Sequence, residues 1–423
     1  MTTTLPTLAK LKPNPNWAKL PLFNRKNWSR FRFGDVVENV NERVAPADAA
    51  EEIYVGLDDL DSGGLHIRRW GKGSDVIGTK LRFRKGDIIF GRRRAYQRKL
   101  AVAEMDGICS AHAMVARAKP NVALPEFLLF LMMSDKFMNR AVDISVGSLS
   151  PTINWTTLKL EEFDLPPLDQ QRRIAEILWA VDEVACAEFK MTSAIDGLLN
   201  SLRTRLGKED SLGNGLRLIE DFRPPTGWQI VHGKELVSAP ITRGYTPTGS
   251  MNTETAKIPF IKVYNLRFDG SFDFTKDPTF IESAVHEGEL LRSQTLPGDV
   301  LINLTGPPMG KISVVPDTYP VWNINQAIAR YRIDDSLLRD YFTIYLQSHW
   351  AQTWFDMRAK KTSGQKNITL QLAQDLPVPL PPKKAMESFV TSYRAVENAH
   401  RQLRVHSQAN STLMASISNS VFV

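Results

Sequence analysis

The chain has 423 residues, of which 43% are hydrophobic and 23% are charged, so it can bury ordinary globular cores and is long enough for two or three domains. Its 53 Lys and Arg residues exceed its 46 Asp and Glu residues, and the net charge of +7 permits a polyanionic partner without requiring one. Two widely separated cysteines, Cys109 and Cys186, exclude a disulfide-rich scaffold and favour a reducing, cytoplasmic location. Neither a signal-peptide core nor an apolar run of about 18 residues is found, so export and membrane insertion are not expected.

Several short sequence features recur in the same order at a nearly constant offset. RKGDIIF at 84–90 is similar to LPGDVLI at 296–302, with an offset of 298 − 86 = 212 between the glycines. The serines Ser134 and Ser348 follow at an offset of 214, and a Gly-rich polar loop recurs at 145–154 and 361–369. A Pro-rich strand end closes each copy. The order predicts a duplicated mixed domain of short strands, one helix near 125–140 or 336–356, and further strand.

Each copy runs into a stretch of helical periodicity. In the first stretch a heptad register places apolar residues at eight of ten seam positions: Ile174, Ile177, Val181, Val184, Met191, Ile195, Leu198 and Leu202. The second stretch has the same spacing at Met386, Phe389, Tyr393 and Val396. Because a long helix with one apolar stripe needs a partner, we expect the two helices to pack together, with the alternative that each covers only its own domain.

These patterns predict an α+β protein in six parts. The parts are an N-terminal segment (1–27), a first mixed domain (28–165), a central spacer helix (166–207), a linker (208–227), a second mixed domain (228–380) and a C-terminal spacer helix (381–423).

The positive charge is concentrated in one segment of the first domain. Residues 66–99 contain twelve Lys or Arg and two acids, a charge of +10, which leaves 7 − 10 = −3 for the remainder of the chain. Such a stripe suits phosphate neutralisation and recognition of guanine edges, although a solvated surface is the alternative. A smaller basic cluster adjoins the second Gly-rich loop. The predicted DNA-binding residues are Arg68, Arg69, Arg82, Arg84, Arg92, Arg93, Arg94, Arg98, Lys99, Ser148, Lys311, Arg358, Lys360, Lys361 and Lys366.

Motifs for catalysis are missing from the sequence. GPPMGKIS at 306–313 is one residue short of a phosphate-binding loop, and no histidine pair has metal-ligand spacing. Asp87 and Asp299 of the repeated Gly-Asp pair are expected to form turns before strands. We therefore predict that the chain is not an enzyme by itself and binds no cofactor or metal. The alternatives are a self-sufficient DNA-modifying or DNA-cleaving enzyme with a diverged site, and a protein-assembly scaffold.

The sequence LPPLDQQRRIAEIL (165–178), together with the repeated GDIIF and GDVLI strands, resembles the specificity subunits of type I restriction-modification systems. The resemblance implies two target recognition domains joined by two long helices packed as an antiparallel coiled coil. Each domain would read one half of a bipartite, asymmetric target in double-stranded DNA. The helices, with Gln170 and Gln171 at the first entry, would set the spacer and bind two modification (methyltransferase) subunits.

The resemblance also assigns the chemistry to partners. The modification subunits would carry AdoMet, and ATP and Mg²⁺ would likewise be bound by partner subunits. Two restriction subunits would join the complex for cleavage, while a modification-only system is the alternative.

Overall fold

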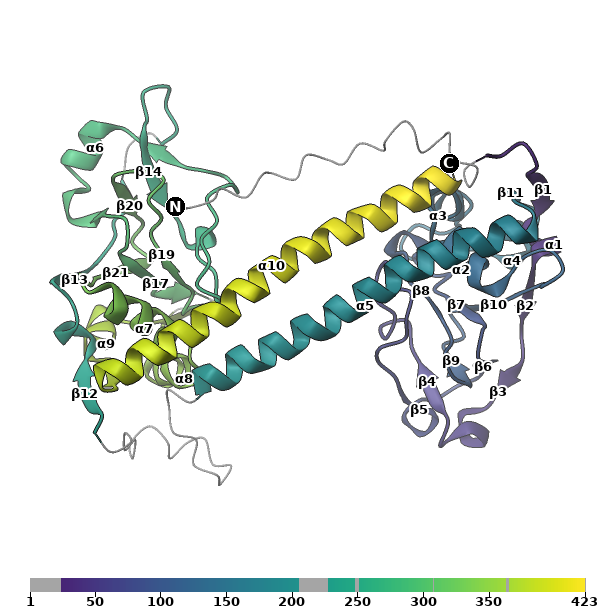
Figure 1. Ribbon diagram of the computed structural model, residues 1–423, viewed down its shortest axis with the longest axis horizontal. Helices are drawn as coiled ribbons and strands as arrows, with labels where there is room; N and C mark the ends of the chain where they lie inside the picture. The colour runs from purple at the N-terminus through teal and green to yellow at the C-terminus, as the bar shows by residue number, and fades with distance from the viewer. Residues whose placement is uncertain (1–23, 205–226, 248–250, 307, 363–364, 423) are drawn as a thin grey trace. The chain divides into compact units, whose positions relative to one another are not determined.

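The computed structural model describes residues 24–204, 227–247, 251–306, 308–362 and 365–422 (Figure 1). Residues 1–23 of the predicted N-terminal segment, 205–207 of the predicted central helix, and 208–226 of the predicted linker lie outside the described residues. The chain divides into two compact units. Unit 1 comprises Met1–Lys190 and Arg404–Val423, and unit 2 comprises Met191–Leu403. Each unit therefore contains one mixed domain and part of each long helix.

Unit 1 contains a four-stranded sheet, a five-stranded sheet and a two-stranded sheet, and its elements are short because turns interrupt the apolar runs every few residues. The strands are β1 (Ser29–Arg32), β2 (Val37–Val40), β3 (Arg43–Val44), β4 (Ile53–Val55), β5 (Gly71–Lys72), β6 (Lys80–Phe83), β7 (Ile88–Phe90), β8 (Leu100–Val102), β9 (Gly107–Cys109), β10 (Met114–Ala118) and β11 (Glu162–Leu165). The helices before the long helix α5 (Leu168–Thr204) are α1 (Phe33–Val36), α2 (Pro125–Met133), α3 (Asp135–Asp143) and α4 (Trp155–Leu158).

Unit 2 has a similar series of elements. Its strands are β12 (Gln229–His232), β13 (Ala239–Arg243), β14 (Ile258–Ile261), β15 (Phe280–Ile281), β16 (Gln294–Thr295), β17 (Val300–Asn303), β18 (Thr305–Gly306), β19 (Ile312–Val314), β20 (Trp322–Ile324), β21 (Ile328–Arg332), β22 (Lys360–Thr362), β23 (Gln365–Asn367) and β24 (Pro377–Leu380). Its helices are α6 (Ser283–Glu287), α7 (Ser336–Leu346), α8 (His349–Arg358) and α9 (Leu370–Asp375), and the long helix α10 (Lys383–Phe422) begins in this unit and ends in unit 1.

The predicted duplication is confirmed by the strand order. One sheet runs β2-β10-β7-β8 in unit 1 and β13-β21-β17-β19 in unit 2. The first and last strands of each domain pair antiparallel, β1 with β11 and β12 with β24. In the other large sheet a parallel pair recurs, β4 with β9 and β14 with β20. The two domains are therefore copies of one topology.

The repeated Gly-Asp pair is a turn before a buried strand, as predicted. Gly86 and Gly298 have φ values of +91° and +90°, which glycine adopts without steric cost. Asp87, only 1% exposed, accepts hydrogen bonds at 2.7 and 2.8 Å from the Arg117 guanidinium across the sheet. Asp299, 2% exposed, accepts the same two bonds from Arg332. Both carboxylates are therefore occupied in holding adjacent strands together.

The prediction of a single helix after the sheet is wrong in both domains. The chain forms α2 and α3 in unit 1 and α7 and α8 in unit 2, with Ser134 and Ser348 at the breaks. Each serine has an extended backbone, and its hydroxyl accepts a hydrogen bond from the backbone N–H three residues later, at 3.2 Å. A helix N-cap stabilises the new start because it satisfies an otherwise unpaired N–H. The repeated serine therefore marks a helix boundary.

The two long helices pack against each other in antiparallel order within each unit, which confirms the expected fold. In unit 1 the start of α5, with Ile174 and Leu178, shares a core with the end of α10, where Phe422 lies against Phe127 at 5.4 Å between ring centroids. In unit 2 the end of α5, with Leu199, shares a core with the start of α10, including Met386, Val390 and Tyr393. Of the four seam residues predicted on α10, Met386 and Tyr393 are buried and Phe389 and Val396 half-buried.

Half of the predicted seam on α5 is wrong. Ile174 is buried, and Val181, Ile195 and Leu202 are half-buried, whereas four other predicted residues are between 41% and 55% exposed: Ile177, Val184, Met191 and Leu198. Their places in the packed stripe are taken by residues one position later, Leu178, Ala185, Thr192 and Leu199. Both stripes repeat every seven residues, so the spacing did not distinguish them. No helix in the described parts of the chain is both long and apolar enough to span a membrane.

Candidate nucleic-acid interface

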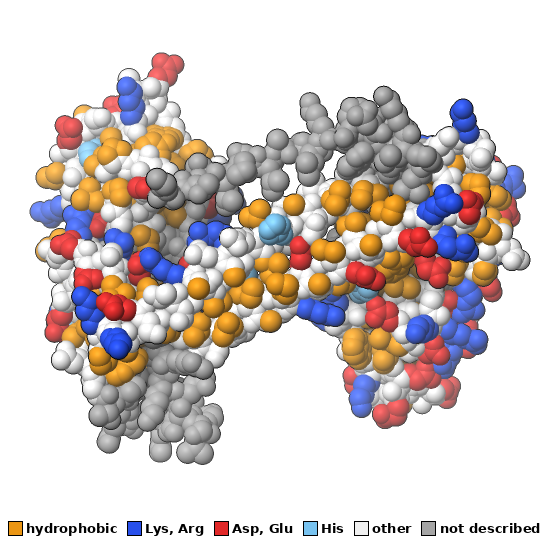
Figure 2. All heavy atoms as spheres, in the orientation of Figure 1, with side chains coloured by type: hydrophobic (Ala, Val, Ile, Leu, Met, Phe, Trp, Pro, Cys, Tyr) orange, Lys and Arg blue, Asp and Glu red, His pale blue; other side chains and the backbone are white. Residues whose placement is uncertain are grey.

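Most of the basic residues between 66 and 99 are paired with acids. Seven of the twelve form ion pairs with carboxylates outside this segment: Arg68, Arg69, Lys72, Arg82, Arg84, Arg98 and Lys99. Figure 2 shows blue and red side chains intermingled over the β-rich part of unit 1. Lys80 is largely buried and donates to the carbonyls of Ile77 and Gly78. The charge of +10 is therefore reduced locally by acids that come from other parts of the sequence.

The four remaining cations, Lys85, Arg92, Arg93 and Arg94, form no ion pair with any residue that the structure describes. The three arginines lie together in the turn that follows the central strand β7. Arg93 and Arg94 are exposed, and Arg92 is half-buried and donates to the carbonyl of Ala111 at 3.2 Å. This arginine turn is thus the part of the basic segment that has guanidinium groups available for a ligand.

The backbone holds the arginine turn in a specific conformation. Arg94 and Arg98 have φ values of +59° and +51° and flank a single 3-10 turn. This left-handed conformation costs a non-glycine residue about 1–3 kcal/mol and clusters at functional sites. Arg98 offsets part of that cost because its guanidinium donates to the carbonyl of Met133 at 2.9 Å and pairs with Asp135 at 2.6 Å. The hydrogen bond from Arg98 holds the pKa of Asp135 below its usual value.

The first Gly-rich loop lies directly beside the arginine turn. The N–H of Arg94 donates to the carbonyl of Pro151 at 2.7 Å, and Arg93 forms an isolated antiparallel bridge with Thr152. The guanidinium groups of both arginines also reach the Ser150 hydroxyl at 3.3 Å. The tip of the loop is exposed and includes Ser148 and Leu149, which is 92% exposed. Two predicted segments that are far apart in sequence therefore form one basic and polar surface.

Unit 2 has a counterpart at the same place in its fold. The strand β18, which follows the central strand β17, pairs with β23, and β23 pairs with β22. This small sheet carries Lys360, Lys361 and Lys366 beside a cavity of about 780 Å³. The ammonium of Lys366 pairs with Asp356 at 2.5 Å, and Arg358 lies over the Trp354 ring at 4.9 Å from its centroid.

Lys311, the other DNA-contact residue predicted in unit 2, lies immediately before β19 and is half-buried, and its backbone N–H donates to the Asn303 side chain at 2.6 Å. The DNA contacts of these residues stay predictions.

The two glutamines at the start of α5 have different environments. Gln171 is 1% exposed and links the start of α5 to the segment before α2. Its side chain accepts a hydrogen bond from the Leu124 N–H and donates to the carbonyls of Val122 and Pro166, all at 2.9 Å. Its side chain is therefore engaged within unit 1, and its predicted role in a subunit interface stays a prediction. Gln170 is half-buried and donates to the carbonyl of Asn24 at 3.2 Å.

The face of α5 turned away from α10 is apolar. In unit 1 it carries Ile177, Ala180, Val184 and Ala187, and in unit 2 it continues with Met191, Ala194 and Leu198, all of them exposed. We call these seven residues the outer stripe. Hydrophobic side chains are visible along the long helices in Figure 2. Their alternating spacing of three and four residues is typical of a second helix-packing seam.

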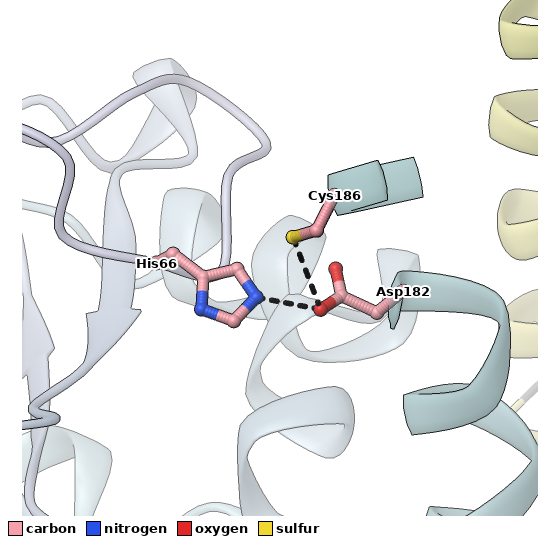
Figure 3. A group of neighbouring side chains, drawn as sticks. All are labelled: His66, Asp182 and Cys186. Atoms are coloured by element: carbon pink, nitrogen blue, oxygen red, sulfur yellow. Dashed lines mark hydrogen bonds and ion pairs between the residues drawn. The ribbon is translucent and has the colours of Figure 1, made fainter. Parts of the chain in front are cut away.

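A cluster in unit 1 that the sequence did not predict joins His66, Asp182 and Cys186 (Figure 3). Nε2 of His66 lies 2.6 Å from Oδ2 of Asp182, and its Nδ1 lies 2.5 Å from Oε1 of Glu104. The hydrogen bond to Asp182, with that to Glu104, outweighs burial and raises the pKa of His66 to about 9. Burial raises the pKa of Cys186. Only the four-residue spacing of Asp182 and Cys186 was visible in the sequence, because His66 is 116 residues away.

Comparison with known proteins finds similarity to one family. The family described as "Type I restriction modification DNA specificity domain" matches residues 25–191. The Escherichia coli EcoDI specificity subunit is 27% identical over 195 residues, which are 43% of this chain and 41% of that protein. The putative MjaX specificity subunit of Methanocaldococcus jannaschii is 21% identical over 393 residues, 88% of this chain and 87% of that one. The chain thus spans less than half of the first relative and most of the second.

Solved structures agree with this placement. A chain from a study of complex assembly and conformational transition in a type I restriction-modification system has a TM-score of 0.54 at 25% identity and covers 94% of this chain and 98% of its own length. The S subunit from M. genitalium has a TM-score of 0.61 at 15% identity, with coverage of 96% and 98%, and therefore supports the fold alone. The duplicated domains, the paired long helices and these likenesses agree, and over most of its length the chain is similar to the specificity subunits of type I restriction-modification systems.

Proposed function

We propose that this chain provides the DNA sequence specificity of a type I restriction-modification complex and that each mixed domain reads one half of a bipartite target. One observation carries the proposal: two copies of one topology each present a basic surface after the central strand of the same sheet. In unit 1 this surface is the arginine turn with the loop around Ser148, and in unit 2 it is the sheet of β18, β22 and β23. Arginine forks suit both phosphates and guanine edges.

The partners follow from the same proposal. Two modification subunits would bind the long helices and carry AdoMet and the adenine chemistry, and ATP and Mg²⁺ would belong to the restriction subunits. The outer stripe of α5 supports a helix-binding partner, because an exposed apolar face with seam spacing is costly to leave in water. The complex would act in the cytoplasm, where the host DNA lies. A system without restriction subunits would use this chain in the same way.

The first experiment tests whether the chain directs methylation. The chain is purified with its modification subunit, and adenine methylation is mapped on genomic DNA with the chain present and omitted. We expect methylation at one split motif only when the chain is present. Methylation at the same positions without it would contradict the proposal. Turnover by the isolated chain with DNA, AdoMet and Mg²⁺ would instead favour a self-sufficient enzyme.

The second experiment tests the arginine turn. In the triple variant Arg92→Gln, Arg93→Gln and Arg94→Gln, we expect the assembled complex to bind DNA more weakly. Each phosphate contact contributes about 0.9 to the slope of log affinity against log salt, so three lost contacts reduce the slope by up to about 2.7. The matched control is Arg30→Gln, an exposed arginine paired with Asp164 at 3.0 Å on β1. An unchanged affinity and slope in the triple variant would show that this turn does not face DNA.

A further inference from the structure

The cluster around His66 brings three kinds of metal-binding group together from two separate elements. His66 lies in the segment between β4 and β5, whereas Asp182 and Cys186 are one turn apart on α5. One potential ligand atom from each lies within 4.8 Å of the other two. Residues four positions apart project from the same face of a helix, so α5 offers a carboxylate and a thiol as a pair. Figure 3 shows the imidazole directed at this pair.

The surroundings of His66 match those of a metal-bound histidine. A metal-binding imidazole usually donates its other N–H to a carboxylate, which fixes the tautomer and the ring orientation. Here Nδ1 lies 2.5 Å from a Glu104 oxygen, which leaves Nε2 directed at Asp182 and Cys186. The side chains of His66 and Asp182 are 21% and 12% exposed. The site is therefore mostly enclosed but retains an opening for a fourth, solvent-derived ligand.

The distances require only small side-chain movements to accept an ion. Tetrahedral zinc with bonds of about 2.0–2.3 Å to N, O and S places its ligand atoms roughly 3.4 Å apart. The present separations are 2.6 Å between His66 Nε2 and Asp182 Oδ2, and 3.9 Å between that oxygen and Cys186 Sγ. The first must widen and the second must shorten, each by less than about 1 Å.

The charge also balances. An imidazole, a thiolate and a carboxylate are the ligands that zinc accepts. Binding would displace one proton from Nε2 of the His66 imidazolium and one from the Cys186 thiol, so that a doubly charged cation replaces two protons and the net charge of the cluster is unchanged. Burial raises the pKa of the Cys186 thiol, and the hydrogen bond with Arg68 opposes part of that rise. The cluster can thus take up a divalent cation without leaving an uncompensated charge.

We propose that His66, Asp182 and Cys186 form a zinc site that fastens the segment before β5 to α5, with Glu104 orienting the imidazole. The site lies wholly within unit 1 and differs from the arginine turn in its residues. Its role is structural: a bound ion links a segment of the first recognition domain to the helix. Arg68, whose guanidinium also lies 4.4 Å from the Phe189 ring centroid on α5, comes from the same segment.

The test uses the full-length chain without a metal-binding tag. The protein is incubated with zinc, dialysed against metal-free buffer and analysed for zinc per chain by mass spectrometry. We expect about one zinc per wild-type chain. Cys186→Ala and His66→Gln should lose most of it. The matched control Cys109→Ala removes the other cysteine, which is buried in β9, and should retain the ion. Zinc that remains in Cys186→Ala, or a wild-type chain that retains none, would overturn the proposal.

A second measurement, alkylation of the wild-type chain, does not depend on the folding of a variant. Alkylation of Cys186 in the wild-type chain is followed by peptide mass spectrometry with and without zinc. Because a metal-bound thiolate is blocked from reaction, zinc should slow alkylation at least about tenfold, whereas Mg²⁺, which prefers oxygen ligands, should not. Cobalt in place of zinc should give a thiolate-to-metal absorption band that Cys109→Ala keeps and Cys186→Ala lacks. Equal alkylation rates with and without zinc would mean that the cluster is only an ion pair. DNA binding is not a readout, so failure here leaves the proposed function untouched.

Discussion

Replacing Asp87 by asparagine tests the structural role of the repeated Gly-Asp turn. The carboxylate receives three hydrogen bonds: Nε of Arg117 to Oδ1 at 2.7 Å, Nη2 of Arg117 to Oδ2 at 2.8 Å, and the backbone N–H of Arg84 to Oδ2 at 2.8 Å. An asparagine side chain has one oxygen and one NH₂ group of nearly the same shape. Whichever way the amide is turned, its NH₂ faces at least one N–H donor, and the negative charge is lost.

The expected cost follows from the burial of the pair. Removing one partner of a buried ion pair costs about 3–5 kcal/mol. Because the Arg117 side chain is 35% exposed and can be rehydrated, we expect the lower value, about 3 kcal/mol. At about 2–4 °C per kcal/mol for a unit of this size, the melting temperature should fall by roughly 6–12 °C. Asp299→Asn should have a similar effect in unit 2, where Arg332 makes the same two bonds.

The measurement combines calorimetry with hydrogen exchange, which shows which unit is affected. Amides of β7 and β10 should lose protection in Asp87→Asn, and those of β17 and β21 in Asp299→Asn. The control is Asp61→Asn, whose ion pair with Arg69 is 29% and 54% exposed and is worth less than about 1 kcal/mol. A wild-type melting temperature and unchanged hydrogen exchange in Asp87→Asn would contradict the role of Asp87 in holding β7 and β10 together. If a DNA-cleaving activity disappeared in that stable variant, the carboxylate would be catalytic.

Three further predictions concern the helices and the sheet. Leu178→Ala, at a fully buried position, should lower the free energy of unfolding by about 2–5 kcal/mol. Val184→Ala, at a position 48% exposed, should change it by no more than about 0.5 kcal/mol. Equal costs would contradict the assignment of Leu178, and not Val184, to the stripe packed in the core. Gly107→Ala should destabilise unit 1 by about 1–3 kcal/mol in urea unfolding, since a β-carbon there would lie 2.6 Å from a backbone carbonyl oxygen of β4; an unchanged midpoint would oppose this. One heptad inserted after Ala194, with a matching heptad near His400 on α10, should lengthen the spacer between methylated half-sites by about 3 base pairs, because seven residues add about 10.5 Å of helix. An unaltered spacer would contradict the proposal that the helices set its length.

The sequence predicted the features that depend on order and local chemistry. Duplication was visible because the Gly-Asp turns at Asp87 and Asp299, and the serines at Ser134 and Ser348, have the same role in both copies. Helical periodicity likewise identified both long helices. The break at each serine was missed because apolar residues continue across it, while the N-cap is only a hydroxyl bonded to a backbone N–H three residues later.

The candidate site was predicted only in part, because its electrostatics depend on residues distant in sequence. Arg82 pairs with Glu42 and Glu52, and Arg98 pairs with Asp135, none of which lies in the basic segment. A count of charges within 66–99 therefore overestimated the free positive charge. The register of α5 was ambiguous for a different reason: the helix has two apolar stripes, and only the position of α10 determines which one is buried.

The division of both helices between the units bears on synthesis of the protein. The core of unit 1 includes Val421 and Phe422, and Phe422 lies 422 − 190 = 232 residues beyond Lys190, the last residue of the first segment of that unit. At about 5–20 residues per second, a ribosome needs roughly 12–46 s to make that stretch. Unit 2 is formed from one continuous segment, Met191–Leu403, and can close earlier. The domain translated first is therefore completed last, and until then the apolar surface of Ile174 and Leu178 is open to chaperones and proteases.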